Sequence, residues 1–402
     1  MFFCAMADTE SVLLVDYTDS FGGAFEQASR LLTHLDKRGG LRLGLVTAQP
    51  QGAFADRLPA GVQTYHIRNY RQAPKTGSRL GRLAAGVTDL AATDLPLAAE
   101  VAAASLKFRA RLLHLNNLIN DQQSAALAAF ITRARCICTH RDFEYPSRYA
   151  RLAARLVDHH VAISRAVLEN LLQFGIPAEK IALIHDCVDI DSFKNVAPLD
   201  LAHEFGVPAE RRILGLFGRL VPWKGHGILL QSLALILPHA PQTHALIVGS
   251  GSDPAYETEL RNLAAELGVS EHVTFCGYRR DVPAVMGAVD IVLHLSTRPE
   301  PFGLVVPEGM AAKKPVVAMN EGGPPDVVIH GTTGFLVEPR NPEAVAAVLR
   351  DLLANPELRS AMGEAGRARA AESFSAGKCA AKYAALYRHV LGRHVLGRQV
   401  LG

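Results

Sequence analysis

The sequence has few cysteines, little net charge and no long apolar run, and each shortage excludes a class of protein. Six cysteines in 402 residues, without Cys-x-x-Cys or Cys-x-x-His spacing, exclude a disulfide framework and predict inert buried thiols in a reducing compartment. A formal net charge of +3 argues against a nucleic-acid partner. No run of 18 apolar residues occurs, which predicts that no helix spans a membrane.

The first seven residues lack a basic region and an apolar core of the length found in secretory signals. We therefore expect no signal peptide and a cytoplasmic protein. With 49% hydrophobic and 20% charged residues, the chain has the composition of a globular protein, and its length favours two domains.

Short β-branched or apolar runs alternate with helical runs in both halves of the chain. This alternation predicts parallel sheets with helical crossovers, and thus two doubly wound, Rossmann-like α/β domains. The strands expected in the first half are residues 12–16, 41–47, 62–67, 112–115, 136–139 and 160–163. Those expected in the second half are residues 213–217, 244–248, 273–276, 290–295 and 315–319.

Two further segments complete the predicted organisation. Residues 195–212 contain two prolines and several charges and are the best candidate for a linker. We therefore assign an N-terminal domain to residues 1–195, a C-terminal domain to 196–372 and a final helix to 373–392. Residues 393–402 continue a pentapeptide that occurs three times from Arg388, and they are either a frayed tail or a basic, apolar membrane contact.

The loops that follow the strands of the second half carry the residues suited to an anionic ligand. In parallel α/β sheets, ligands bind beyond the carboxyl ends of the strands. Residues 218–225 combine glycines with Arg219 and Lys224, which could neutralise a diphosphate without a metal, although both could also be solvated surface cations. Gly249 lies in a second glycine-rich loop. Gly277, Tyr278 and Arg279 follow the third strand, where backbone groups could bind a base, unless Tyr278 only packs.

The strongest signal is a pair of glutamates eight positions apart, Glu300 and Glu308. Glu300 is expected on a loop and Glu308 inside the following helix. The residues between them include Phe302, Gly303 and Leu304, where a helix N-terminus would offer free N–H groups to an anion or a sugar hydroxyl. A carboxylate in such a site accepts hydrogen bonds from vicinal hydroxyls. The alternative for Glu308 is an exposed helix residue.

In order and spacing, these motifs resemble the retaining glycosyltransferases of family 4, which have the GT-B fold of two Rossmann-like domains around a cleft. The resemblance rests on Gly218-Arg219 with Lys224-Gly225, on Glu300-x7-Glu308, and on residues 321–337. It implies that Arg219 and Lys224 hold the donor diphosphate and that Glu308 binds the ribose. It also implies that Glu300 and the backbone of residues 302–304 face the transferred sugar, and that the terminal helices return to the N-terminal domain.

The first half resembles the family more weakly. Gly22-Gly23 is similar to a glycine loop near donor and acceptor, which would cradle phosphate unless it is a simple tight turn. His140 stands where members carry a histidine at a strand end; it would act at the sugar or be a hydrogen-bonded structural histidine. Three places depart from the pattern: Arg141 follows His140 where Asp is frequent, Asp186-Cys187 stands where Asn-Gly is frequent, and Asp326 stands where Glu is common.

Two other patterns were weighed as metal sites. Asp189-Ile190-Asp191 has the Asp-x-Asp spacing of another glycosyltransferase fold, but it lies outside the matching context. His159 and His160 precede a strand and are expected to pack or to be solvated. We expect no metal and no cofactor, with a nucleoside-diphosphate sugar as co-substrate.

Basic residues are concentrated in the first half, as in the stretch from Arg68 to Arg82. They form either a solvated face or a surface for anionic lipid head groups. The resemblance thus implies a metal-independent, retaining hexosyltransferase of GT-B fold whose acceptor is a glycan or a lipid-linked molecule. Together with the basic residues, it implies a setting in polysaccharide biosynthesis at the inner face of a membrane. The alternatives are another sugar-nucleotide enzyme, such as an epimerase or a small-acceptor transferase, and a non-catalytic sugar-nucleotide-binding module.

Overall fold

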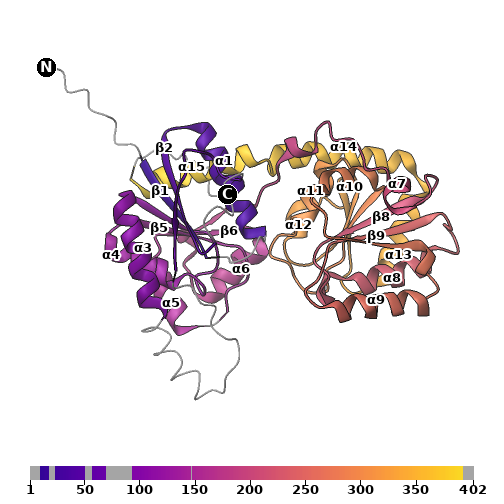
Figure 1. Cartoon of the computed structure of the whole chain (residues 1–402), viewed down its shortest axis with the longest axis horizontal. Helices are drawn as coiled ribbons and strands as arrows, with labels where there is room; N and C mark the ends of the chain where they lie inside the picture. The colour runs from indigo at the N-terminus through magenta and orange to yellow at the C-terminus, as the bar shows by residue number, and fades with distance from the viewer. Residues whose placement is uncertain (1–9, 18–22, 50–56, 69–92, 146, 393–402) are drawn as a thin grey trace, which may run out of the picture. The chain divides into compact units, whose positions relative to one another are not determined.

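The computed structural model consists of two compact α/β units (Figure 1). It describes residues 10–17, 23–49, 57–68, 93–145 and 147–392. Unit 1 extends to Asp186 and resumes at Ala376, and unit 2 comprises Cys187–Ser375. The predicted class of two Rossmann-like domains is confirmed.

Unit 1 is built on a seven-stranded sheet in the order β3-β2-β1-β4-β5-β6-β7, and all pairs are parallel. Strand β1 is buried along its whole length because it has a strand on either side and helices on both faces. The strands are β1 (Glu10–Asp16), β2 (Leu41–Thr47), β3 (Gln63–His66), β4 (Leu112–Leu115), β5 (Arg135–His140), β6 (His159–Ala162) and β7 (Ile181–Leu183).

The helices of unit 1 cover both faces of this sheet (Figure 1). Helices α3, α4 and α5 pack in sequence against one another, whereas α1 packs against the C-terminal α15. Serine side chains cap two of them, as Ser164 does for α6 by accepting a hydrogen bond from the amide of Val167. The helices are α1 (Gly23–Arg38), α3 (Leu95–Phe108), α4 (Gln123–Thr132), α5 (Arg148–Ala154), α6 (Arg165–Phe174), the 3-10 helix η2 (Ala178–Lys180) and α15 (Ala376–Val390).

Buried hydroxyl groups attach α15 to the sheet of unit 1. Both ring nitrogens of His114 are hydrogen-bonded, Nδ1 to the Tyr387 hydroxyl at 2.8 Å and Nε2 to the Thr139 hydroxyl at 2.7 Å. The Thr139 hydroxyl also contacts the hydroxyl of Tyr383 at 2.9 Å. All four side chains are buried, so this network fixes the terminal helix by polar as well as apolar contacts.

Unit 2 is a second parallel sheet, with six strands in the order β10-β9-β8-β11-β12-β13. Its strands are β8 (Arg212–Phe217), β9 (Thr243–Val248), β10 (Val273–Gly277), β11 (Ile291–His294), β12 (Val316–Met319) and β13 (Gly334–Val337). Its helices are η3 (Ile190–Phe193), α7 (Leu201–Phe205), η4 (Pro222–Lys224), α8 (His226–Ile236), α9 (Pro254–Glu266), η5 (Ser270–His272), α10 (Val282–Ala288), α11 (Val305–Ala311), α12 (Pro324–Val327), α13 (Pro342–Ala354) and α14 (Pro356–Ser373). Leucine, isoleucine and valine from α8, α13 and the central strands form its core.

The boundaries between the units differ from the predicted ones at residues 195 and 372. The chain enters unit 2 nine residues earlier, because Val188 N donates a hydrogen bond to Phe374 O at 2.8 Å. The predicted linker is also part of unit 2, where Leu199 N bonds Ala284 O at 3.0 Å. Of the two terminal helices expected to return, α15 belongs to unit 1, whereas α14 packs on α11 in unit 2.

Sequence reasoning missed two strands, β7 and β13. Each is an edge strand of three or four residues, too short to show a pattern. Gly22, most of the basic stretch from Arg68 to Arg82 and the repetitive tail 393–402 lie outside the described residues. Among the helices that the structure describes, none is both long and apolar enough to cross a bilayer.

Candidate active site

The loops at the carboxyl edge of the unit 2 sheet pack backbone against backbone. Gly249 follows β9 with a φ of +146°, and a Cβ atom there would lie 1.8 Å from the carbonyl oxygen of Gly218. Gly225, at the start of α8, would bring a Cβ within 1.8 Å of Leu295 O. The predicted glycine-rich loops therefore allow three strand ends to meet at one edge, where a ligand could also approach the backbone.

Lys224 and Glu300, predicted to contact different parts of a donor, are in direct contact with each other. Lys224 Nζ donates a hydrogen bond to Glu300 Oε1 over 2.7 Å. His294 Nε2 lies 3.0 Å from the same oxygen, and the Ser296 hydroxyl donates to it as well. The ion pair is mostly buried, with 15% and 10% of the two side chains exposed.

This environment fixes the charge of Glu300. Burial by itself would raise the pKa of the carboxyl group, but His294 and Lys224 outweigh it and hold the pKa well below its usual range. The carboxylate is therefore ionised and accepts hydrogen bonds only. The ammonium of Lys224 also lies 4.5 Å from the ring centre of Trp223, which restricts where it can move.

The other cation of the first loop differs from Lys224. Arg219 is exposed, and it makes no ion pair or side-chain hydrogen bond to a described residue. Its guanidinium group is thus available to a ligand at the edge where Lys224 is held in place. Glu308 lies in the first turn of α11 and is half-buried, in contrast to the alternative of a fully exposed helix residue.

The segment between the two glutamates is shaped by close contacts. Gly303 has a φ of +79°, and a Cβ atom on it would lie 2.9 Å from His294 Nε2. Phe302 is buried and packs edge-on against Phe374 at 6.0 Å, so only its backbone could face a sugar. Leu304 caps the start of α11 without a side-chain hydrogen bond.

The third loop brings Gly277 to the same edge, since the amide of Gly249 donates a hydrogen bond to Gly277 O at 2.9 Å. Tyr278 is 68% exposed, so it does not serve the plain packing role that was its alternative. The guanidinium group of Arg279 is bound by Asp281 at 2.6 Å and by Glu204 at 2.5 Å. Nucleoside binding in this loop remains a prediction, and it falls to the backbone and Tyr278 more than to the Arg279 side chain.

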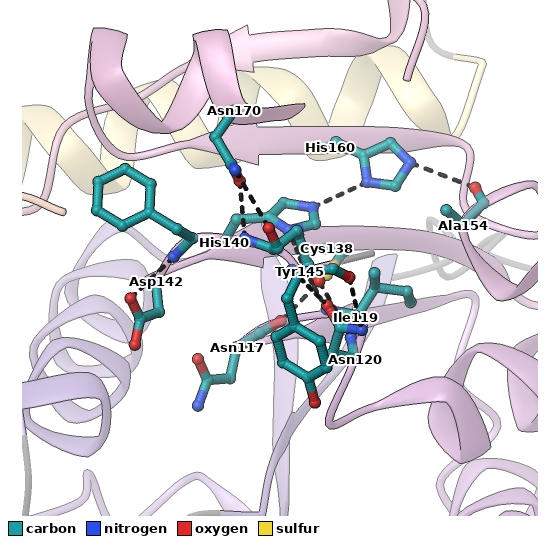
Figure 2. Close-up of polar contacts among 12 residues, drawn as sticks. Asn117, Ile119, Asn120, Cys138, His140, Asp142, Tyr145, Ala154, His160 and Asn170 are labelled. Atoms are coloured by element: carbon teal, nitrogen blue, oxygen red, sulfur yellow. Dashed lines mark hydrogen bonds and ion pairs between the residues drawn. The ribbon is translucent and has the colours of Figure 1, made fainter. Parts of the chain in front are cut away.

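In unit 1, His140 ends β5 and has both ring nitrogens occupied (Figure 2). Nδ1 lies 2.8 Å from Glu144 Oε1, and Nε2 lies 2.9 Å from His160 Nδ1. Burial lowers the pKa of His140, which favours the neutral ring. These contacts match the alternative of a hydrogen-bonded structural histidine, and direct action at the sugar stays a prediction.

The two departures from the family pattern in unit 1 are bonded to each other. Arg141 pairs with Asp186, and both side chains are nearly buried. The same guanidinium group donates to Asn116 Oδ1 at 3.0 and 3.2 Å, and Asn116 donates in turn to Asp16 at 2.7 Å. This network links the ends of several strands at the carboxyl edge of sheet 1. Gly23 begins α1 and is exposed, while Gly22 is not described.

The residues weighed as metal ligands have structural roles. Asp189 caps η3 by accepting a hydrogen bond from Asp191 N, and Asp191 pairs with Lys194 at 2.6 Å. His160 is buried beside His140, whereas the ring of His159 lies 5.3 Å from that of His389. Within the described part of the chain, no three His, Cys, Asp or Glu side chains form a group suited to a metal ion.

Sequence reasoning missed His294, Ser296 and Asn116. Each is at or just beyond the carboxyl end of a parallel strand, the position that the rule for ligand sites singles out. Reading every polar residue at those ends would have found all three. The pairing of Asn116 with Arg141 spans 25 positions, and the pairing of Ser296 with Glu300 spans four positions of a loop with no regular period, so neither pairing could be read from the sequence.

Two parallel-sheet units of these strand orders define the GT-B class of glycosyltransferases, and solved structures of that class superpose on the whole chain. A glycosyltransferase from Rickettsia africae matches with a TM-score of 0.82 at 23% identity, covering 96% of this chain and all of that one (100%). HepE of Anabaena, solved with UDP-glucose, matches with a TM-score of 0.76 at 26% identity, covering 94% of this chain and 99% of that one.

Family models match both halves. The model described as glycosyltransferase family 4 matches residues 21–192, and that of the group 1 glycosyl transferases matches residues 201–369. The chain belongs to the family 4, group 1 glycosyltransferases.

The curated relatives are similar over part of their length. The D-inositol 3-phosphate glycosyltransferase of Corynebacterium efficiens is 38% identical over 189 residues, which is 46% of this chain and 44% of that protein. The chain thus spans about half the length of the curated relatives it matches.

Proposed function

We propose that the protein is a retaining glycosyltransferase that moves a hexose-type sugar from a nucleoside diphosphate to a hydroxyl acceptor. The observation that supports this most is the Lys224–Glu300 ion pair beside the exposed Arg219, at the edge where three glycine-rich loops meet. UDP-glucose in the Anabaena structure supports a nucleotide-sugar donor.

The charges of the site residues suggest separate roles for the cations and the carboxylates. Arg219 and Lys224 would bind the diphosphate and neutralise the charge that grows on it as the glycosidic bond breaks. Glu300, ionised and aimed at Lys224, would accept hydrogen bonds from sugar hydroxyls and keep the lysine in place when no donor is bound. Glu308 would accept hydrogen bonds from the ribose.

We propose that the acceptor attacks from the face that the diphosphate leaves, which retains the configuration of the sugar in a single displacement. The donor phosphate would take the acceptor proton, so no protein nucleophile is needed. The two cations supply the charge that a metal ion would otherwise supply, and we therefore propose a metal-independent reaction. Turnover that survives excess EDTA supports this; loss restored by Mg²⁺ or Mn²⁺ contradicts it.

The acceptor is proposed to be a phosphorylated polyol, a lipid-linked molecule or a growing surface glycan. The Corynebacterium relative, named for D-inositol 3-phosphate, supports the first class. Contact with an anionic membrane fits exposed apolar and basic residues on neighbouring helices, such as Leu106 and Lys107 on α3 and Phe130 on α4. Vesicle flotation at low and high salt tests that contact, and protein that never floats with anionic vesicles contradicts it.

The decisive experiment incubates the protein with a panel of nucleotide sugars, with and without candidate acceptors, and follows products by NMR. Release of nucleoside diphosphate together with an acceptor product of the donor's anomeric configuration supports the proposal. Conversion of a nucleotide sugar without an acceptor would identify an epimerase instead. Binding without turnover across the panel would identify a non-catalytic module.

A further inference from the structure

Unit 1 contains a pocket at the amino-terminal edge of its sheet, opposite the edge that carries His140 and Gly23. It lies between the end of α5, the start of β6 and the turn from α6 to β7, and it has a volume of about 340 Å³. Its lining includes Arg151, Arg155, Lys180, His160, Phe174 and Ile176. Nothing in the proposed transfer reaction uses these residues.

The lining of this pocket is basic and contains no carboxylate. Arg151, Arg155 and Lys180 have no ion pair with a described residue, although many exposed cations of the chain do. Asp158, the acid just before β6, is bound by Arg135 at 2.8 Å. Three cations around one hollow repel one another, and an anion between them removes that repulsion.

One wall of the pocket is apolar. Phe174 and Ile176 are buried, and the guanidinium carbon of Arg151 lies 5.6 Å from the Phe174 ring centre, which orients the arginine. A hollow of this size, lined by both cations and apolar groups, suits a small phosphate monoester with a short carbon skeleton. The phosphate could belong to a free metabolite or to a lipid head group.

His160 connects this pocket to a buried chain of polar groups (Figure 2). Its Nε2 lies 3.3 Å from the carbonyl oxygen of Ala154, and its Nδ1 lies 2.9 Å from His140 Nε2. His140 Nδ1 in turn lies 2.8 Å from Glu144 Oε1, whose carboxyl group accepts from the amides of Ile119 and Asn120.

The chain has three contacts, Glu144–His140, His140–His160 and His160–Ala154 O, and each needs one hydrogen to be a hydrogen bond. All three hydrogen bonds therefore form only when the chain carries three protons. In one arrangement Glu144 donates its proton to His140 Nδ1, His140 Nε2–H donates to His160 Nδ1, and His160 Nε2–H donates to Ala154 O. In a second, Glu144 is a carboxylate and His140 is protonated on both nitrogens, a charged form that is disfavoured because burial lowers the pKa of His140. In the third, Glu144 is a carboxylate, His140 is protonated on Nδ1, and His160 is protonated on both nitrogens. The first and the third differ by one proton hop at each of two bonds, and removal of a proton from the chain leaves two lone pairs facing each other.

The groups around the chain favour the first, uncharged arrangement. The titratable groups that face His160 are His140, Lys180 and His159, while Cys138 and Tyr145 face Glu144. Burial lowers the pKa of His160, and His140, Lys180 and His159 lower it further, whereas burial raises the pKa of Glu144 to about 7. A phosphate dianion beside Lys180 would attract positive charge and so raise the pKa of His160, opposite to the effect of the neighbouring cations.

We propose that this amino-edge pocket binds a phosphate monoester, and that binding moves the shared proton from Glu144 through His140 onto His160. His160 then adds a fourth positive charge to Arg151, Arg155 and Lys180. No proton is taken from solvent, because the one that leaves Glu144 Oε1 enters His140 Nδ1 as His140 Nε2–H passes to His160. The site thereby couples its ligand to the protonation of the residue that ends β5.

Calorimetric titration with sn-glycerol 3-phosphate tests the site. The full-length chain carries Arg219→Ala and Lys224→Ala, so that the proposed donor site does not contribute. We expect saturable binding that Arg155→Ala or Lys180→Ala weakens about tenfold or more. The matched control is Arg148→Ala, which removes an exposed arginine of α5 that does not line the pocket. This variant should leave the affinity unchanged.

Vesicles of phosphatidylcholine with and without phosphatidic acid distinguish the sources of the phosphate. Binding of glycerol phosphate alone supports a free metabolite, and vesicle binding that requires Arg155 and Lys180 supports a lipid head group. No saturable binding of either probe overturns the site, as does equal weakening by the Arg148 control. Since no sugar transfer is measured, this failure is separate from a failure of the proposed function.

Nitrogen-15 NMR of histidine-labelled protein tests the proton shift, with signals assigned through His140→Gln and His160→Gln. On saturation with glycerol phosphate, His160 should change to the doubly protonated form. His140 should stay singly protonated but exchange Nε2–H for Nδ1–H. Unchanged His160 signals at full occupancy would overturn the coupling.

Discussion

Arg141 is bonded to Asp186, and each stands where the family pattern carries a different residue. Either residue by itself is a departure, but together they form one nearly buried ion pair that also holds Asn116. This relationship makes the pair testable as a unit.

Removal of one partner should cost more than removal of both charges. Arg141→Met or Asp186→Asn leaves an uncompensated buried charge, so we expect each to lower the free energy of unfolding by about 3–5 kcal/mol. The double variant should recover part of that loss. Urea unfolding measures it, and Arg135→Ala, in an exposed pair with Asp158, is the control with an expected cost below about 1 kcal/mol. Additive single effects would contradict coupling.

Arg219→Ala and Lys224→Ala should each impair transfer while the fold stays intact. Loss of one charge-assisted phosphate contact costs about 1.5–3 kcal/mol, which corresponds to roughly 10–150-fold in rate. Steady-state kinetics measures the loss of transfer, and circular dichroism checks that the fold is intact. Lys313→Ala, in an exposed pair with Glu364, is the matched control. Near-normal rates for both variants would contradict the assignment of Arg219 and Lys224 to diphosphate binding.

Glu300 should contribute stability that depends on pH. Because its pKa is lower in the folded than in the unfolded chain, its ion pair stabilises the fold above the ordinary value of 4.5. That contribution is lost as the pH falls through the folded-state pKa. We expect the difference in unfolding free energy between wild type and Glu300→Gln to shrink from about pH 7 to about pH 3. A difference that stays constant over this range would contradict the assignment.

Glu308→Gln should weaken donor binding and leave stability nearly unchanged. A carboxylate accepts two ribose hydroxyl bonds, whereas an amide keeps one acceptor and adds a donor group. Calorimetric titration with the donor nucleoside diphosphate measures the affinity. If the dissociation constant equals that of wild type, Glu308 has a structural role on α11.

Gly249→Ala should disrupt the meeting of the loops in unit 2. Its Cβ would lie 1.8 Å from Gly218 O at a φ that other residues rarely adopt, so the loop must move. We expect a loss of at least about 1–3 kcal/mol in stability and weaker donor binding. Gly227→Ala is the control, since its Cβ would make only an ordinary contact at 3.7 Å. Equal melting temperatures for the two variants would contradict this account.

The sequence was most informative where local pattern and edge position decide the outcome. Alternating runs predicted the central strands of both sheets, and the strand-end rule brought the loops of Lys224, Gly249 and Glu300 to one edge. It was least informative about pairing across long separations. Lys224 and Glu300 are 76 positions apart, and the amides of Ile119 and Asn120 donate to Glu144 across 25 and 24 positions. Those contacts depend on packing, which no short window contains.

The attachment of α15 sets an order for folding. Unit 1 is interrupted in sequence by all of unit 2, and the tyrosines that bond to His114 and Thr139 follow unit 2 in the sequence. During synthesis, residues 187–375 can complete their sheet while unit 1 still lacks its final helix. A chain stopped before Ala376 would expose the apolar surface that α15 covers and leave His114 Nδ1 without its tyrosine partner, which makes that intermediate the stage most open to aggregation or proteolysis.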